Sequence, residues 1–213
     1  MEELVEIEVD GRSLAVSKST IVLQALRDHG IDIPALCYYP SLEAYGSCGL
    51  CMVEIWSTDI WNPRHACLLE VEDGLQIKTA TPRLQRLRSW AAQILLHGRP
   101  FHNSEVEDLL LKLVQDEVAD GQEKENWAES IKNLSGSTTE GCILCGLCIR
   151  MCRKVGKNRL TFLGRGKNLR IGLVPGEGNK ASCGNCCACR NICPMGFISS
   201  DAEHAFKARL YKE

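Results

Sequence analysis

The sequence lacks the features that mark a secreted or a membrane protein. No stretch reaches the ~18 consecutive apolar residues of a membrane-spanning helix. Residues 1–6 are acidic and lack the basic region that begins a secretory signal. There is also no glycine-rich phosphate loop and no nucleophile–base motif. We therefore expect a cytoplasmic protein with no transmembrane segment and no active site of its own.

What the sequence does have is cysteine, with thirteen in 213 residues. Twelve of them fall into three sets of four: Cys37, Cys48, Cys51 and Cys67; Cys142, Cys145, Cys148 and Cys152; and Cys183, Cys186, Cys189 and Cys193. An odd total, a long chain and the lack of a secretion signal argue against disulfide bonds. Four thiolates are what one iron–sulfur cluster needs. Cys187 is left over and is interpreted as a packed spare thiol.

The second and third sets share the spacing C-x2-C-x2-C-x3-C, and a proline follows the last cysteine. In two-cluster ferredoxins the fourth cysteine of such a run binds the other cluster. The spacing therefore predicts two [4Fe–4S] clusters with crossed ligands. One is held by Cys142, Cys145, Cys148 and Cys193, and the other by Cys183, Cys186, Cys189 and Cys152. Zinc sites with four cysteines use C-x2-C pairs separated by a longer spacer, which is a different pattern.

The first set has spacers of ten, two and fifteen residues. Plant-type [2Fe–2S] ferredoxins begin with a spacer of four, so the long first loop is a departure. Gly46 and Gly49 flank Cys48, where a close backbone approach lets N–H groups hydrogen-bond to cluster sulfur. We predict one [2Fe–2S] cluster on these four cysteines. A zinc site and reduced core cysteines are the alternatives.

Charge is unevenly spread although the net charge is only −2. Residues 102–140 carry ten acidic and three basic residues, whereas residues 141–190 carry ten basic residues and one acidic residue. Clusters ligated by thiolates are anionic, so basic residues near them offset that charge and raise the reduction potential. Phe162 is the one aromatic residue among these bases, too few for a base-stacking platform. We expect no nucleic-acid partner.

Residues 1–80 have the element pattern of a β-grasp domain. Alternating apolar residues, with the turn signal Asp10-Gly11, predict a set of strands. These strands are residues 4–9, 12–16, 52–56 and 75–79. Apolar residues at helical spacing predict a helix over residues 20–29, capped by Ser19 or Thr20 and ended by Gly30.

Residues 81–135 contain no cysteine and are predicted to form a helical connector. Pro82 suits the start of a first helix. Its apolar face consists of Leu84, Leu87, Ala91, Ile94 and Leu95. Ser104 and Glu107 form a capping box for a second helix. The apolar stripe of that helix is Val106, Leu109, Leu110, Leu113 and Val114. A short third helix is predicted around Trp127, Ile131 and Leu134.

Residues 136–213 are predicted to form a ferredoxin-like domain with two [4Fe–4S] clusters. Between its cysteine runs, residues 160–163 and 169–174 predict a short hairpin, and residues 201–211 predict a surface helix. The expected fold class of the chain is α+β. Its predicted parts are a β-grasp [2Fe–2S] domain (1–80), a helical connector (81–135) and a two-[4Fe–4S] ferredoxin-like domain (136–213).

These motifs resemble a known family. Residues 46–54, GSCGLCMVE, resemble the [2Fe–2S] loop at the N-terminus of the complex I iron–sulfur subunit. The same loop is found in the small diaphorase subunit of NAD-reducing hydrogenases, in iron-only hydrogenases and in electron-bifurcating oxidoreductases. Residues 142–148 and 162–166 resemble the paired [4Fe–4S] module of that group. The resemblance spans nearly the whole chain in the same order.

One departure concerns a further cluster. Many members of the group hold an additional [4Fe–4S] cluster between the two domains through one histidine and three cysteines. Residues 95–100 resemble the start of that segment, but the three cysteines are absent. His97 cannot complete such a site, so we expect about ten irons per chain.

The resemblance implies an electron-transfer subunit of a multisubunit NAD(P)H-linked oxidoreductase of the hydrogenase, formate dehydrogenase or bifurcating type. Such a subunit relays single electrons between a flavin- and NAD(P)H-binding subunit and a catalytic oxidoreductase subunit of a hetero-oligomer. One alternative is the iron–sulfur subunit of a succinate dehydrogenase or fumarate reductase, whose first cysteine spacer resembles the short plant type. Another is a zinc-stabilised interaction module.

Overall fold

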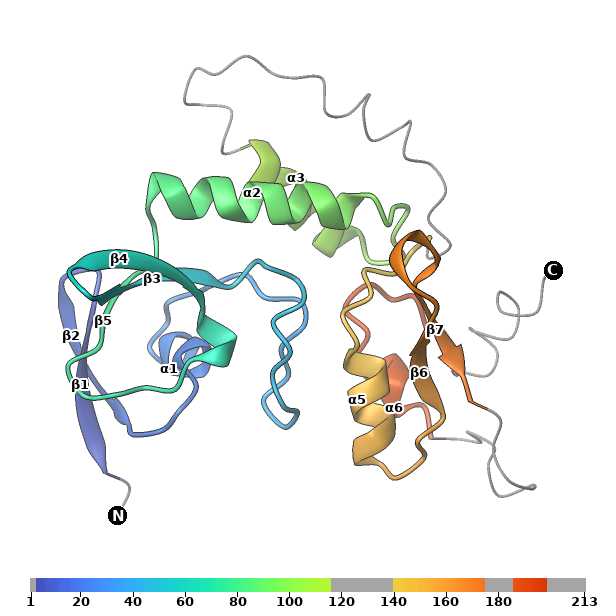
Figure 1. Cartoon of the computed structure of the whole chain (residues 1–213), viewed down its shortest axis with the longest axis horizontal. Coiled ribbons are helices and arrows are strands. Elements are labelled where there is room, and N and C mark those ends of the chain that lie inside the picture. The colour runs from blue at the N-terminus through green and yellow to red at the C-terminus, as the bar shows by residue number, and fades with distance from the viewer. Residues whose placement is uncertain (1–2, 116–139, 175–185, 199–213) are drawn as a thin grey trace. The chain divides into compact units, whose positions relative to one another are not determined.

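The computed structural model describes residues 3–115, 140–174 and 186–198 (Figure 1). These residues form two compact units. The first contains residues 3–40, 44–94 and 110–115, and the second contains residues 41–43, 95–109, 140–174 and 186–198. Residues of the predicted connector are found in both units. The predicted third helix, Cys183 and the predicted C-terminal helix lie outside the described residues.

The first unit is built on a five-stranded mixed sheet with the order β2-β1-β5-β3-β4. Its strands are β1 (Leu4–Val9), β2 (Arg12–Ser17), β3 (Met52–Ser57), β4 (Ile60–His65) and β5 (Gln76–Lys78). β1 pairs antiparallel with β2 and parallel with β5, and β3 pairs antiparallel with both β5 and β4 (Figure 1). This mixed sheet with its helix agrees with the [2Fe–2S] ferredoxin domain that the sequence predicts.

The pattern of β1 explains how the core of this unit forms. Its alternate residues Val5, Ile7 and Val9 are buried. They belong to the same core as Leu23 and Leu26 of helix α1 (Val22–Asp28). Burying each such side chain contributes about 1.5–3 kcal/mol. The alternation that predicted a strand therefore also fixes which face of the strand packs inward.

The hairpin of β1 and β2 closes at the predicted turn. Asp10 and Gly11 both have positive φ, of +50° and +79°. Two left-handed residues match the twist of a two-residue hairpin turn, and Gly adopts this backbone without a steric cost.

Strand β4 is not predicted from the sequence, because Pro63 lies in its middle. A proline cannot donate a hydrogen bond to a ladder, so it lowers the expectation of a strand. β4 is an edge strand of the sheet, and an edge strand tolerates proline. Pro63 lies opposite Glu54 of β3.

The predicted cap of α1 is wrong, whereas its predicted end is confirmed. Ile21 is the N-cap, and no side chain caps the helix. A backbone contact takes this role, since the N–H of Val22 donates to the carbonyl of Leu69 at 2.8 Å. Gly30 has a φ of +76°, and its N–H donates to the carbonyl of Arg27 at 3.0 Å.

Helix α2 (Pro82–Leu96) begins at Pro82 as predicted, but its buried face differs from the prediction. Ile94, expected on the apolar face, is 70% exposed, whereas Arg88 and Ser89 are 9% and 0% exposed. Arg88 is buried because its guanidinium donates hydrogen bonds to backbone carbonyls. The spacing of apolar residues in the sequence cannot predict a buried arginine of this kind.

Helix α3 (Ser104–Gln115) is capped by a different residue from the one predicted. The side-chain oxygen of Asn103 accepts a hydrogen bond from the N–H of Glu105 at 3.2 Å. Its backbone carbonyl accepts the N–H of Glu107 at 3.3 Å. Asn103 is therefore the N-cap, and Ser104 already lies inside the helix. Leu110 and Val114 of the predicted stripe are buried.

The second unit contains short elements. They are α5 (Leu147–Lys154), β6 (Leu160–Leu163), the 3-10 helix η3 (Gly166–Asn168), β7 (Arg170–Leu173) and α6 (Ala188–Asn191). β6 and β7 form the predicted antiparallel hairpin. Across the described residues, every helix is too short or too polar to cross a membrane.

Candidate iron–sulfur sites

The structure brings the four cysteines of the first set together inside the first unit. Cys37 and Cys48 lie in the long segment between α1 and β3, and Cys51 immediately precedes β3. Cys67 lies in the 3-10 helix η1 (Ala66–Leu68), which follows β4. All four are at most 3% exposed, and Cys51 and Cys67 belong to the hydrophobic core.

The four sulfur atoms lie as two close pairs. Those of Cys37 and Cys48 are 3.4 Å apart, and those of Cys51 and Cys67 are 3.3 Å apart. Two thiolates on one tetrahedral metal, with bonds of about 2.3 Å, lie about 3.7 Å apart. A [2Fe–2S] cluster has two irons, each of which takes two cysteines. The donor set and its pairing therefore fit this group. Nowhere in the described residues do three His, Cys, Asp or Glu side chains form a site for a single metal ion.

In each pair, the pKa of one thiol is lowered and the pKa of the other is raised. The hydrogen bond between the sulfurs of Cys37 and Cys48 lowers the pKa of Cys37 to about 5, and backbone N–H groups of Cys48 and Ser47 act in the same direction. The same bond and burial raise the pKa of Cys48. The bond from Cys51 likewise lowers the pKa of Cys67. Metal coordination deprotonates both thiols of a pair, so cluster assembly releases protons and weakens as the pH falls.

Two glycines shape the loop that surrounds Cys48. Gly46 and Gly49 have φ of +67° and +71°, a backbone conformation that L side chains rarely adopt. A Cβ on Gly46 would lie 2.8 Å from Leu68, and a Cβ on Gly49 would lie 3.1 Å from Ala91. The backbone conformation therefore favours glycine at both positions, and at Gly49 a side chain would also crowd Ala91. As the sequence predicts, the loop turns N–H groups toward sulfur, and the N–H of Cys48 lies 3.4 Å from the Cys37 sulfur.

One apolar cavity of the second unit is lined by cysteines from both C-terminal runs. The four are Cys142, Cys145, Cys148 and Cys193. Apolar side chains complete the lining, among them Ile171, Met195 and Phe197. Cys152, the fourth cysteine of the first run, is not among the described residues that line this cavity. This is the grouping that the crossed ligand prediction requires.

Burial is the main influence on the thiol pKa in this cavity. Burial raises the pKa of Cys148 well above its ordinary value, and the neighbouring sulfurs of Cys145 and Cys142 add to the effect. The N–H of Leu144 lies 3.4 Å from the Cys142 sulfur. Apolar walls, convergent thiols and an inward N–H form a suitable environment for a [4Fe–4S] cluster, since burial and hydrogen bonds to sulfur set its potential.

The ligands predicted for the other [4Fe–4S] cluster are described in part. Cys152 of α5 is 6% exposed, and its sulfur accepts the N–H of Arg159 at 3.2 Å. Cys186 is exposed and Cys189 is half-buried. Cys183 lies outside the described residues. The spare Cys187 is half-buried, has a φ of +46° and is the N-cap of α6.

The sequence did not reveal that residues 98–103 contact the polypeptide beside two predicted ligands. We call this segment the clasp. Its Gly98 carbonyl accepts the N–H of Gly141 at 2.6 Å, one residue before Cys142. The side-chain amide of Asn103 donates to the carbonyl of Pro194 at 2.9 Å, one residue after Cys193. The one sequence signal was Asn103 directly before a helical pattern, which is a position typical of an N-cap.

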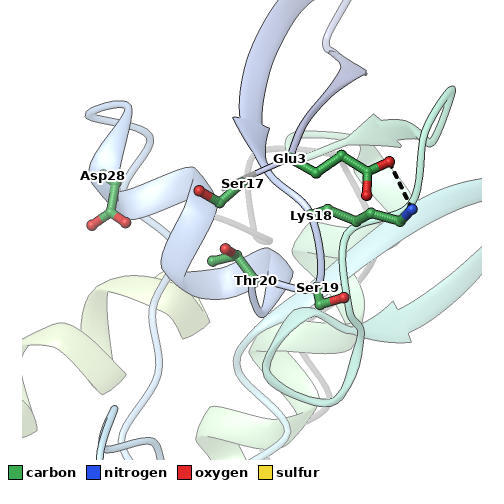
Figure 2. A pocket seen from close by; sticks show the side chains of 6 residues that line it. All are labelled: Glu3, Ser17, Lys18, Ser19, Thr20 and Asp28. Atoms are coloured by element: carbon green, nitrogen blue, oxygen red, sulfur yellow. Dashed lines mark hydrogen bonds and ion pairs between the residues drawn. The ribbon is translucent and has the colours of Figure 1, made fainter. Parts of the chain in front are cut away.

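The first unit also has an open hollow whose described lining contains no cysteine. It is lined by Glu3, Ser17, Lys18, Ser19, Thr20 and Asp28 (Figure 2). The ammonium of Lys18 forms an ion pair with Glu3 at 2.8 Å, and both side chains are more than half exposed (Figure 2). We assign no function to this surface.

The fold and the paired cysteines agree with the family comparison. Residues 2–82 match the sequence profile of a family described as "2Fe-2S iron-sulfur cluster binding domain". This part of the chain is therefore similar to iron–sulfur domains of the [2Fe–2S] class.

The wider chain is similar to iron–sulfur subunits of NADH oxidoreductases. It is 31% identical to "NADH dehydrogenase [ubiquinone] iron-sulfur protein 1, mitochondrial" of Solanum tuberosum, over 99% of this chain and 29% of that protein. It is 29% identical to "NADH-ubiquinone oxidoreductase 75 kDa subunit" of Reclinomonas americana, over 98% of this chain and 31% of that protein. The chain thus spans less than a third of the length of these relatives.

A solved structure shares the fold. A chain of the "NAD+-reducing [NiFe]-hydrogenase in the H2-reduced state" matches with a TM-score of 0.60 and 25% identity. The match covers 83% of this chain and 78% of that one. The resemblance to complex I iron–sulfur subunits and NAD-reducing hydrogenases, predicted from the cysteine motifs, is confirmed.

Proposed function

We propose that this chain is an iron–sulfur electron-transfer subunit of a multisubunit NAD(P)H-linked oxidoreductase in the cytoplasm. It relays single electrons between a flavin- and NAD(P)H-binding subunit and a catalytic subunit, such as a hydrogenase or a formate dehydrogenase. The observation that carries the proposal is the pairing of four buried sulfurs inside a [2Fe–2S] domain. Similarity over nearly the whole chain to "NADPH-Fe(3+) oxidoreductase subunit alpha" of Geobacter sulfurreducens, 28% over 92% of the chain, supports it.

The proposed ligands form three sets. Cys37, Cys48, Cys51 and Cys67 hold a [2Fe–2S] cluster. One [4Fe–4S] cluster is held by Cys142, Cys145, Cys148 and Cys193, and the second by Cys183, Cys186, Cys189 and Cys152. The shared cavity of the Cys142 set supports the crossed arrangement.

The bound clusters supply one-electron redox chemistry. The chain itself holds them, excludes water and adjusts their potentials. Burial of the first set at 3% exposure or less keeps water away from the metal ligands. Backbone N–H groups around Cys37 stabilise negative charge on sulfur, and a more strongly stabilised anion accepts an electron more readily. No described side chain is needed as an acid, a base or a nucleophile in such a relay.

The test is the metal and sulfide content of the full chain, purified without oxygen. We expect a brown protein with about ten irons and about ten acid-labile sulfides. About fourteen irons would reveal a further cluster and overturn the inference drawn from His97. A colourless protein that contains zinc and no sulfide would overturn the proposal in favour of a zinc-stabilised module. Purification from the native organism should yield a flavin-containing subunit with this chain.

A further inference from the structure

Arg88 of α2 is a buried cation. Its side chain is only 9% exposed, and arginine is almost never this buried unless it is paired. One guanidinium nitrogen donates to the carbonyl oxygens of Met52 at 2.5 Å and Thr79 at 2.9 Å. These two bonds tie α2 to the chain beside the first cysteine set.

Neutral carbonyls accept two hydrogen bonds from Arg88 but do not cancel its charge. Among the described residues, no carboxylate forms an ion pair with it. Its buried Nε also lacks a hydrogen-bond partner there. The carboxylate of Asp10 acts on the charge from a distance, but its own oxygens accept the N–H and the hydroxyl of Thr79, at 2.8 and 2.5 Å. A buried cation is costly unless an anion offsets it.

The group whose negative charge would act most strongly on Arg88 is a thiolate at Cys51. Met52, which accepts the shortest of these bonds, directly follows Cys51. Burial lowers the pKa of Arg88, and the charge on Cys51 is the largest influence that raises it. Arginine stays protonated even so. The guanidinium therefore places a fixed positive charge beside a ligand of the [2Fe–2S] cluster, where the low dielectric strengthens their attraction.

We propose that Arg88 is a positioning residue of the [2Fe–2S] site: it fixes the backbone that follows Cys51, and its charge raises the reduction potential of the cluster. This inference rests on the ligand set of the proposed function. A cluster with four thiolates is anionic, and reduction adds a further negative charge. A buried cation stabilises the reduced form more than the oxidised form, and its removal makes reduction harder.

The experiment is a redox titration of the [2Fe–2S] electron paramagnetic resonance (EPR) signal in the full chain with all its clusters. Four variants are compared: Arg88→Met and Arg88→Gln remove the charge, Arg88→Lys keeps it, and Arg86→Met removes a charge from an exposed position on the same helix. At a fixed potential, we expect the ratio of reduced to oxidised cluster to fall at least about tenfold in both neutral variants. For a one-electron couple this is about 59 mV. Arg88→Lys should stay within about threefold of the wild type and Arg86→Met within about twofold.

Each outcome bears on the proposal. Neutral variants with the potential of the wild type would overturn it, since Arg88 would then be a structural contact only. Arg88→Gln retains N–H donors for the two carbonyls, which protects the fold. If both neutral variants lose the cluster while Arg88→Lys keeps it, a cation is required at this position, which supports the proposal. If Arg88→Lys loses the cluster too, the charge role is contradicted. A wild type without any [2Fe–2S] signal would instead refute the proposed function.

Discussion

The two units hold their cysteines in opposite ways. In the first, four cysteines are buried beside a sheet and a helix that already share an apolar core. In the second, cysteines make up much of the core, because Cys148 and Cys152 are among its buried residues and Cys142, Cys189 and Cys193 pack against it. The first unit therefore has a scaffold into which a cluster fits. We expect the second to need the proposed [4Fe–4S] clusters as part of its scaffold.

The sizes of the sheets and helices differ between the two units in the same sense. The first unit has a five-stranded sheet, whereas the second has a two-stranded one. Helix α5 has eight residues and α6 has four. An isolated hairpin and helices this short are marginal in water. Metal binding that completes such a core contributes directly to the free energy of folding.

The largest expected effect is that of cluster removal. After anaerobic removal of iron with a chelator, amides of α5 and the β6–β7 hairpin should exchange with solvent about as fast as in an unfolded chain, because their core has lost its centre. Amides of β1 and β3 should stay protected. Hydrogen exchange read by mass spectrometry checks both regions in one sample. Equal loss of protection in the two regions would contradict the contrast.

A smaller effect is expected from Leu23→Ala in α1. Leu23 is fully buried in the core of the first unit. The cavity should lower the free energy of unfolding of this unit by about 2–5 kcal/mol, measured by denaturant titration of the chain with its clusters. The [4Fe–4S] signals should be unchanged. Their loss together with the first unit would mean that the two units do not unfold separately.

Cys193→Ser tests the crossed ligands within the second unit. Only the cluster led by Cys142 should lose its EPR signal or change to a three-iron form, while the cluster led by Cys183 remains. Cys187→Ser is the matched control, and both clusters should survive it. Loss at the Cys183 cluster alone would show that each run binds its own cluster.

The clasp gives the smallest effect. Asn103→Ala removes the N-cap of α3 and the bond to the Pro194 carbonyl. We expect a loss of about 1–2 kcal/mol in the free energy of unfolding. Ser104→Ala, at the residue that the sequence pattern indicated as the cap, should cost less than about 0.5 kcal/mol. Thermal unfolding of both variants measures these losses. A larger loss of stability in Ser104→Ala than in Asn103→Ala would contradict Asn103 as the N-cap.

The parts of the molecule that spacing controls were predictable from the sequence. The alternation of apolar residues in β1 correctly predicted which face of the strand is buried. The cysteine spacing correctly predicted that Cys37, Cys48, Cys51 and Cys67 lie together. The long first spacer did not prevent Cys37 from pairing with Cys48, because the loop between them bends at Gly46.

Features that depend on distant backbone were not predictable. Ile21 needs no side-chain cap because Leu69, far along the chain, supplies a carbonyl. Arg88 interrupts an apolar helix face because the carbonyls of Met52 and Thr79 accept hydrogen bonds from its guanidinium. Neither partner can be recognised from the residues next to it in sequence.

Spin counting shows whether one chain carries three separate one-electron carriers, as we propose. The anaerobically purified full chain is reduced at low potential, and its EPR spectrum is integrated. We expect about three unpaired spins per chain, one with the relaxation of a [2Fe–2S] cluster and two with that of [4Fe–4S] clusters. A chain that takes up no electrons and shows no signal would contradict it.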